Sequence, residues 1–120
     1  MRDFRGLRVW ERAHRLSLAV NEYFAVVPRR GFAHVARQAQ RAASSIPANI
    51  VEGCGHDSPR EFARYLGHAL ASANELAYNL IEARGFRMID EAHHAEFDDQ
   101  TRRVKRMLVV LIERVRLDSL

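Results

Sequence analysis

Two Glu-x-x-His pairs, Glu11/His14 and Glu91/His94, are the residues of this sequence whose spacing most suggests chemistry. In di-iron helical bundles, such pairs and further glutamates from neighbouring helices ligate the metal together. The apolar pattern argues against a site here. It directs Trp10 inward and therefore Glu11 outward, and His94 lies near the end of its helix. We expect no metal and no cofactor. A metal-dependent bundle enzyme is therefore the third possible function, behind the two that are described below.

The turn "GCGHDS", residues 53–58, places the lone cysteine, Cys54, near His56. A thiol and an imidazole can act as nucleophile and base, and a glycine-rich turn before a helix can bind phosphate. No acid is placed to orient His56, the lysine–serine ending of a phosphate loop is missing, and Asp57 adds negative charge. We interpret the segment as a tight turn with an exposed thiol, and we predict no catalytic residue.

Arginine dominates the positive charge, since Lys105 is the one lysine among 19 basic residues and the formal net charge is +4. Guanidinium groups make bidentate contacts with phosphate and carboxylate. The candidate nucleic-acid-binding residues recur at short helical steps near both ends of the chain: Arg5, Arg8, Arg12, Arg15, Arg102, Arg103 and Arg106. Joined by Arg114 on one surface, they would bind RNA or DNA backbone with little sequence specificity, because no base-reading motif is present.

Two alternatives to a nucleic-acid surface stay open. The arginine bias can reflect the base composition of the genome, and Glu11, Glu22 and Glu113 can neutralise the same arginines. The protein would then be a purely protein-binding or structural oligomer with no nucleic-acid role.

Apolar residues at steps of three and four predict helices at about 6–27, 32–52, 59–84 and 91–117. Short connections make successive helices antiparallel. The expected fold class is therefore an all-α, up-down-up-down four-helix bundle, formed by residues 1–120 as a single domain.

Local signals mark the ends of these helices. Ser58 and Glu61 form a capping box around Pro59, and Asp90 caps the last helix. Gly53 is expected to end the second helix in a left-handed conformation.

Pro47 lies inside the second helix and removes one backbone hydrogen bond. We interpret "SSIPANI" as a kinked helix in which Ser44, Ser45 or a water molecule satisfies the carbonyl that the proline leaves free.

A polar stripe follows one side of each middle helix. The candidate network residues are mostly small or hydrogen-bonding: Gln38, Arg41, Ser45, Asn49 and Glu52, followed by Ser72 and Glu75. We predict a polar network between these helices or across a subunit interface, with Arg37 or Arg41 paired to Glu75. The alternative is two solvated helix faces.

Apolar residues beyond the core stripes predict self-association. Val9, Leu16 and Tyr23 recur every seven residues beside the stripe of the first helix, and "MLVVLI", residues 107–112, is apolar on nearly every side. One small bundle cannot cover all of this surface. A wide core stripe with a few exposed valines is the alternative.

The chain has no apolar run near the roughly 20 residues that span a bilayer, and its first residues are too charged for a signal peptide. A single cysteine is typical of a reducing compartment. We expect a cytoplasmic protein without membrane contact.

Three blocks resemble, in this order, the four-helix-bundle family encoded in intervening sequences of bacterial 23S ribosomal RNA genes: "FRGLRVWERAHRL", "RQAQRAASSIPANIVEG" and "SPREFARYLGHALASANEL". The resemblance covers almost the whole chain and is most specific in the middle block. It implies a homo-oligomer, in the form of a pentameric ring, with no established enzymatic activity.

The resemblance extends remotely to the accessory variability proteins of diversity-generating retroelements, which engage a reverse transcriptase and nucleic acid. We therefore expect a non-enzymatic scaffold or adaptor whose partners are its own copies, RNA or DNA, and another protein.

Overall fold

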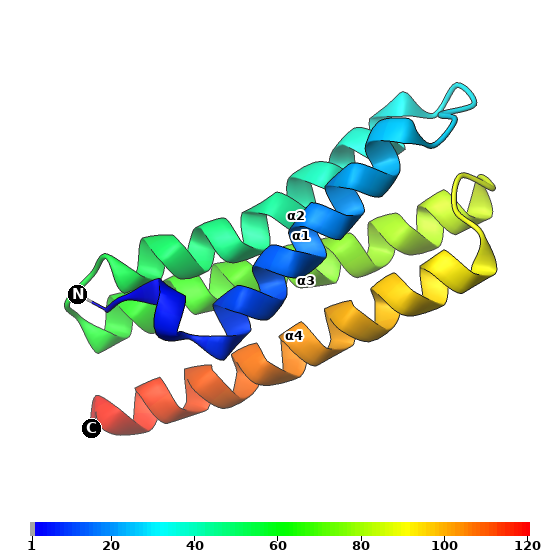
Figure 1. Ribbon diagram of the computed structural model, residues 1–120. Helices are drawn as coiled ribbons and strands as arrows, with labels where there is room; N and C mark the ends of the chain where they lie inside the picture. The colour runs from blue at the N-terminus through cyan, green and yellow to red at the C-terminus, as the bar shows by residue number, and fades with distance from the viewer. Residues whose placement is uncertain (1) are drawn as a thin grey trace.

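The computed structural model describes residues 2–120, and Figure 1 shows their long helices lying side by side along one axis. The helices are α1 (Arg8–Val26), α2 (Ala33–Cys54), α3 (Pro59–Gly85) and α4 (Glu91–Asp118), preceded by the short 3₁₀ turn η1 (Phe4–Gly6). Helix α1 packs against α2 and α4, and α3 packs against the same two helices. The all-α four-helix bundle predicted from the sequence is therefore confirmed, with extents of 50 × 20 × 20 Å.

The predicted starts of the two last helices are confirmed by their cap hydrogen bonds. The Ser58 hydroxyl accepts from the Glu61 backbone N–H at 3.3 Å, and the Asp90 carboxylate accepts from the His93 backbone N–H at 2.7 Å. Each cap satisfies a donor that the first turn of a helix leaves without a partner. The Glu61 carboxylate pairs with Arg64 at 3.0 Å. It therefore does not make the hydrogen bond to the Ser58 backbone that completes a capping box.

The first helix begins later than predicted. The Asp3 carboxylate accepts from the Arg5 backbone N–H at 3.0 Å and starts the separate turn η1, after which Leu7 is extended. This extended residue redirects the chain, so that α1 starts at Arg8 and not at about residue 6.

Gly53 does not end the second helix, which continues to Cys54. A Cβ atom at Gly53 would lie 3.0 Å from Cβ of Tyr65 and 3.3 Å from the backbone oxygen of Phe62. Glycine is therefore needed here because α2 and α3 approach closely, and not because a turn requires a left-handed conformation.

Helix α2 runs without interruption through Pro47, which confirms a helix in place of a loop. The role expected of the adjacent serines is wrong. The Ser44 hydroxyl accepts from Nδ2 of Asn21 on α1 at 3.1 Å, and the Ser45 hydroxyl is 2.8 Å from the Ser72 hydroxyl on α3. These serines thus bond α2 to the helices on both sides of it.

The core stripe of α1 is wider than the one predicted, with Ala13, Val20 and Phe24 buried along its centre. Val9 and Leu16 are buried in the core, whereas Trp10 is only half-buried, with its ring stacked on His14 at a centroid distance of 5.0 Å. The stripe is wide because α1 must cover both α2 and α4. Val9 and Leu16 therefore give no support to self-association, which corrects their interpretation as residues beside the core.

None of the helices in residues 2–120 combines the length and the hydrophobicity needed to span a membrane.

The close approach at Gly53 can be tested with two Gly→Ala variants. In an open helical position, Gly→Ala stabilises by roughly 0.5–1 kcal/mol. Gly67, inside α3, has nothing within 4 Å of its missing Cβ, so we expect G67A to gain about this amount. We expect G53A to lower the free energy of unfolding, because its new methyl group meets Tyr65 and the Phe62 backbone. Urea unfolding of both variants measures the difference, and equal stabilisation by both would contradict the packing argument.

Candidate nucleic-acid interface

The predicted arginines gather where η1 and α1 lie beside α4. Because α1 and α4 are antiparallel neighbours, the start of α1 meets the C-terminal half of α4. Two hollows follow this seam. The first, here called the arginine groove, has a volume of about 460 Å³ and is lined by Gly6, Leu7, Arg8, Val9, Arg106, Met107, Val110, Leu111 and Arg114. The second, the mixed-charge hollow, lies further along and is lined by Arg12, Arg15, Ala19, Glu96, Asp99, Gln100, Arg103 and Val104.

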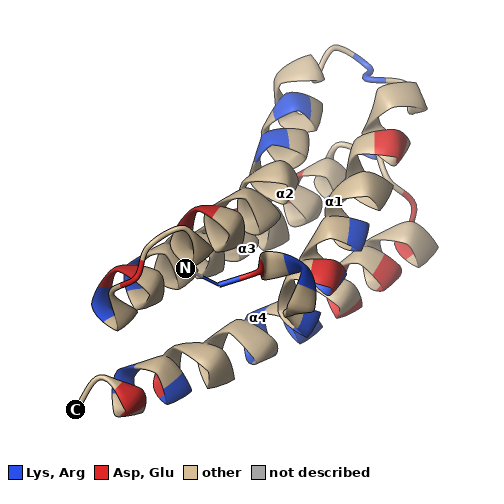
Figure 2. Ribbon diagram, turned by 60° about the vertical axis from the view of Figure 1, so that its left-hand side comes forward, with Lys and Arg blue, Asp and Glu red and all other residues tan. Residues whose placement is uncertain are grey.

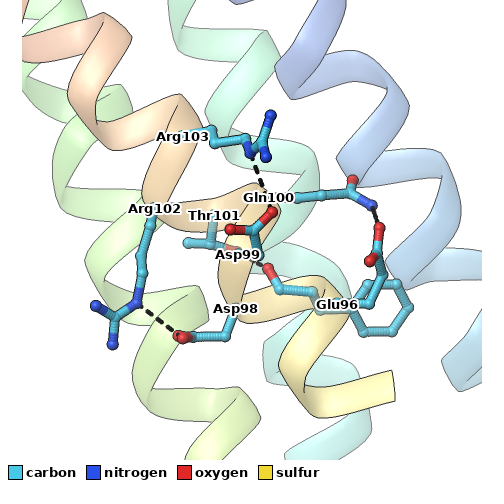
Figure 3. Close-up of polar contacts among 8 residues, drawn as sticks. Glu96, Asp98, Asp99, Gln100, Thr101, Arg102 and Arg103 are labelled. Atoms are coloured by element: carbon cyan, nitrogen blue, oxygen red, sulfur yellow. Dashed lines mark hydrogen bonds and ion pairs between the residues drawn. The ribbon is translucent and has the colours of Figure 1, made fainter. Parts of the chain in front are cut away.

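Four of the seven predicted arginines form ion pairs with acids near them in the sequence. The distances are 3.3 Å for Arg5–Asp3, 2.6 Å for Arg15–Glu11, 2.8 Å for Arg102–Asp98 and 3.0 Å for Arg103–Asp99. Figure 3 shows the two pairs on α4, each joining residues one helical turn apart. Exposed pairs of this kind contribute only about 0.3–0.5 kcal/mol, but they compensate the positive charge locally.

The other three predicted arginines, Arg8, Arg12 and Arg106, have no acidic partner within 4.0 Å among residues 2–120, and neither does Arg114. Figure 2 shows basic segments on α1 and α4 and acidic segments among them. Three of these four arginines line the arginine groove. Uncompensated positive charge is therefore concentrated at this groove, while the mixed-charge hollow contains acids as well.

The floor of the arginine groove is apolar. Val110 is 58% exposed, and Met107 and Leu111 are half-buried beside it. The sequence indicated this surface through "MLVVLI", although Leu108 and Ile112 of that segment are buried in the core. The groove thus combines cationic rims with an aliphatic floor and can hold a ligand that is both anionic and apolar, or the phosphates of a nucleic acid along its rims.

The predicted network residues form two groups and one outlier. In the first group, the Ser45 and Ser72 hydroxyls are 2.8 Å apart, and Nδ2 of Asn49 donates to the Ser45 hydroxyl at 3.0 Å. The Ser45–Ser72 bond joins α2 to α3 of one chain, and the Asn49–Ser45 bond lies within α2. The second group, Gln38, Arg41 and Glu75, lines a hollow between the same helices. The other lining residues are Ala71, Asn74, Tyr78 and Asn79.

The predicted ion pair to Glu75 is not formed. Neither Arg37 nor Arg41 lies within 4.0 Å of the Glu75 carboxylate in the part of the chain that the structure describes. All three side chains are exposed, so solvent screens them and no geometry is imposed on the pair. Glu52 lies apart from both groups, 3.8 Å from Nε2 of His56.

The candidate chemical groups are dispersed. Glu11 pairs with Arg15, and the His14 ring stacks on Trp10. His94 places its Nε2 atom in a buried position without a hydrogen-bond partner. Residues 2–120 contain no group of three or more histidines, cysteines, aspartates or glutamates that could hold a metal ion.

Cys54 is buried, which corrects its interpretation as an exposed thiol. The backbone N–H of Arg2 donates to the Cys54 carbonyl at 2.9 Å, and the Arg2 guanidinium lies 4.1 Å from the centre of the Phe62 ring. The N-terminal segment therefore covers this end of α2 and α3. Burial raises the pKa of the Cys54 thiol, which disfavours the thiolate that a nucleophile requires. Sequence reasoning missed Arg2, because no periodic pattern predicts this contact.

Comparison with known proteins identifies a family. A family model described as "23S rRNA-intervening sequence protein" matches residues 5–110. No curated protein matches the sequence. A solved structure, a protein of unknown function from the S23 ribosomal protein family of Bacteroides thetaiotaomicron, superposes with a TM-score of 0.81 at 24% identity. The match covers 88% of this chain and 95% of that one. This structural likeness supports the fold alone.

The hydroxyl pair between α2 and α3 is open to test with Ser72→Ala. Ser72 is nearly buried, so its loss removes one interhelical hydrogen bond and leaves Ser45 with Asn49 alone. We expect the free energy of unfolding to fall by about 1 kcal/mol. Ser44→Ala is the comparison variant, because it removes the interhelical hydrogen bond from Asn21 at an exposed site, where water can replace the hydroxyl, and we expect a change within about 0.5 kcal/mol. Thermal or urea unfolding distinguishes the two, and the network interpretation fails if S72A is as stable as S44A.

Proposed function

We propose a function for this chain, which belongs to the 23S rRNA-intervening sequence protein family. It is a non-enzymatic homo-oligomeric scaffold whose arginine surface contacts RNA or DNA backbone. The family description and that of the solved structure name no catalytic activity. The dispersal of the candidate chemical groups and the burial of Cys54 support a protein without a reaction centre. We assign it to the cytoplasm, because a single buried thiol is typical of proteins in a reducing compartment.

The observation that carries the nucleic-acid proposal is the line of uncompensated arginines along the α1–α4 seam. Arg8, Arg12, Arg106 and Arg114 are all exposed and have no acidic partner among the residues described. Phosphates would supply the missing negative charge, and binding would release condensed counterions. Contacts to the backbone position a nucleic acid without reading its bases, so we expect little dependence on sequence.

The proposal of a homo-oligomer rests on apolar side chains that the single chain leaves exposed. Val109 and Val110 are 41% and 58% exposed on α4, and Tyr78 and Ile81 are 61% and 59% exposed on α3. Clusters of large exposed apolar residues favour association, because contact removes them from water. The family resemblance implies five copies.

The second candidate function is a purely protein-binding or structural oligomer. Four of the seven predicted arginines form local ion pairs, which favours this candidate by reducing the charge available to phosphate. A metal-dependent enzyme has no geometric support in residues 2–120.

Retention on immobilised single-stranded RNA in a salt series tests the arginine surface. Arg8 and Arg12 are replaced by glutamine together. If each contacts one phosphate, the slope of log affinity against log salt becomes less steep by about 1.4. The matched control is R37Q/R60Q, which removes two exposed unpaired arginines from α2 and α3. Native mass is measured for both, so that an altered oligomer is not mistaken for lost contacts.

We expect the control to elute within about twofold of the wild-type salt concentration, since its phosphate contacts are intact. Equal loss of retention in both variants would show that net charge alone governs binding. That outcome, or no retention of the wild-type protein, would contradict the nucleic-acid proposal and favour the protein-binding oligomer.

The assembly is tested by native mass spectrometry with element analysis. We expect a complex of five copies of the 13.8 kDa chain without a stoichiometric metal. The exposed apolar surface supplies the physical reason for association. A monomer at micromolar concentration would contradict the scaffold, and two metal ions per chain would contradict the absence of an enzymatic centre.

A further inference from the structure

We propose that the arginine groove binds the outer side of α3 of a second copy, at a surface that we call the acidic ridge: Glu75, Tyr78, Ile81 and Glu82. This inference rests on the homo-oligomer of the proposed function and assigns the two surfaces that join its subunits. It assigns Arg106 and Arg114 of the groove to the subunit contact and leaves Arg8 and Arg12 on α1 to contact nucleic acid. Binding of nucleic acid to the groove itself is an outcome of the test below.

The groove has an aliphatic floor that phosphate contacts would leave exposed to water. Leu7, Met107, Val110 and Leu111 line it, and no aromatic ring stands among its lining residues to stack against a base. A ligand that fills the groove must therefore bring apolar side chains as well as negative charge. This combination is typical of an acidic helix face from a protein, and it differs from what single-stranded RNA offers.

The acidic ridge has the complementary composition. Tyr78 and Ile81 are exposed and three residues apart, so they lie on one side of α3. Glu75 and Glu82 flank them along the helix. Neither carboxylate has a basic partner within 4.0 Å in residues 2–120. Glu75 is exposed and Glu82 is half-buried.

The spacing of the charges also matches. Arg106 and Arg114 are eight residues apart on α4, which is about 12 Å along a helix, and Glu75 and Glu82 are seven residues apart, about 10 Å. A ridge laid along α4 can therefore bring both carboxylates to both guanidinium groups. Between them, Tyr78 and Ile81 would cover Val110 and Met107. Closely matched, desolvated charge pairs of this kind determine which partner is accepted.

The two surfaces cannot meet within one chain. Helix α3 packs against α2 and α4 and lies diagonally across the bundle from α1, on which the groove depends. Each copy therefore offers one groove and one ridge on different sides. Such a head-to-tail contact forms a closed ring when the rotation between copies closes, and a filament otherwise.

Charge reversal on the two surfaces tests the contact. The groove variant is R106E/R114E, the ridge variant is E75R/E82R, and a third protein carries all four substitutions. Native mass and sedimentation across a concentration series give the subunit dissociation constant. We expect each double variant to raise this constant by more than about 100-fold, because like charges would face each other. We expect the four-fold variant to regain the wild-type mass.

Two controls keep the test independent of folding. R37E/R60E applies the same change in charge as the groove variant to exposed sites on α2 and α3, and we expect it to keep the wild-type mass. Val110→Ser and Ile81→Ser change side chains that are exposed in the single chain, so both fold even if E82R does not. We expect each of these serine variants to weaken association by about tenfold or more.

Specific outcomes overturn the inference. Wild-type mass in the folded groove variant, in the ridge variant or in both serine variants would place the interface elsewhere and leave the proposed homo-oligomer standing. A folded four-fold variant that stays dissociated would contradict the pairing of these two surfaces. A groove variant that keeps its mass but loses retention on RNA would make the groove a nucleic-acid site. A wild-type monomer would overturn the proposed oligomer itself, and this inference with it.

Discussion

The close approach of α2 and α3 is the constraint on which the rest of the bundle depends. Small buried residues, among them Ala39 and Ala43 on α2 and Ala69 and Ala73 on α3, allow the two backbones to come together. At the end of α2, a methyl group on Gly53 would be crowded against Tyr65 and Phe62 of α3. With these helices close, the larger side chains of α1 and α4 complete the core around them, since protein interiors tolerate few voids.

This packing also decides which polar groups remain available to a partner. Where α2 and α3 touch, the hydroxyls of Ser45 and Ser72 bond each other, so they are used inside the chain. Further out, side chains such as Arg41 and Glu75 share a hollow without pairing and stay exposed. A buried polar group costs free energy unless it is hydrogen-bonded within the chain, whereas an exposed one can bond to water or to another molecule.

The same distinction applies to charge. Helical spacing places Asp98 and Asp99 one turn before Arg102 and Arg103, and these arginines are compensated within α4. Arg8 and Arg106 have no such neighbour, and the fold brings them together from opposite ends of the chain beside an apolar floor. The local pairs follow from spacing that is visible in the sequence, although a count of arginines by itself overlooks them. The groove follows from the antiparallel contact of α1 with α4.

The sequence by itself determined the helices, their caps at Ser58 and Asp90 and the antiparallel order of the bundle, because periodicity, capping and short turns are local properties of the chain. Only the tertiary structure decided how wide the buried face of α1 is, with Val9 inside it and Trp10 at its edge, and why a glycine stands at position 53. The width of a buried face and the close approach of two helices depend on which surfaces of two neighbours fit together. That fit is a property of pairs of helices, and no single stretch of sequence contains it.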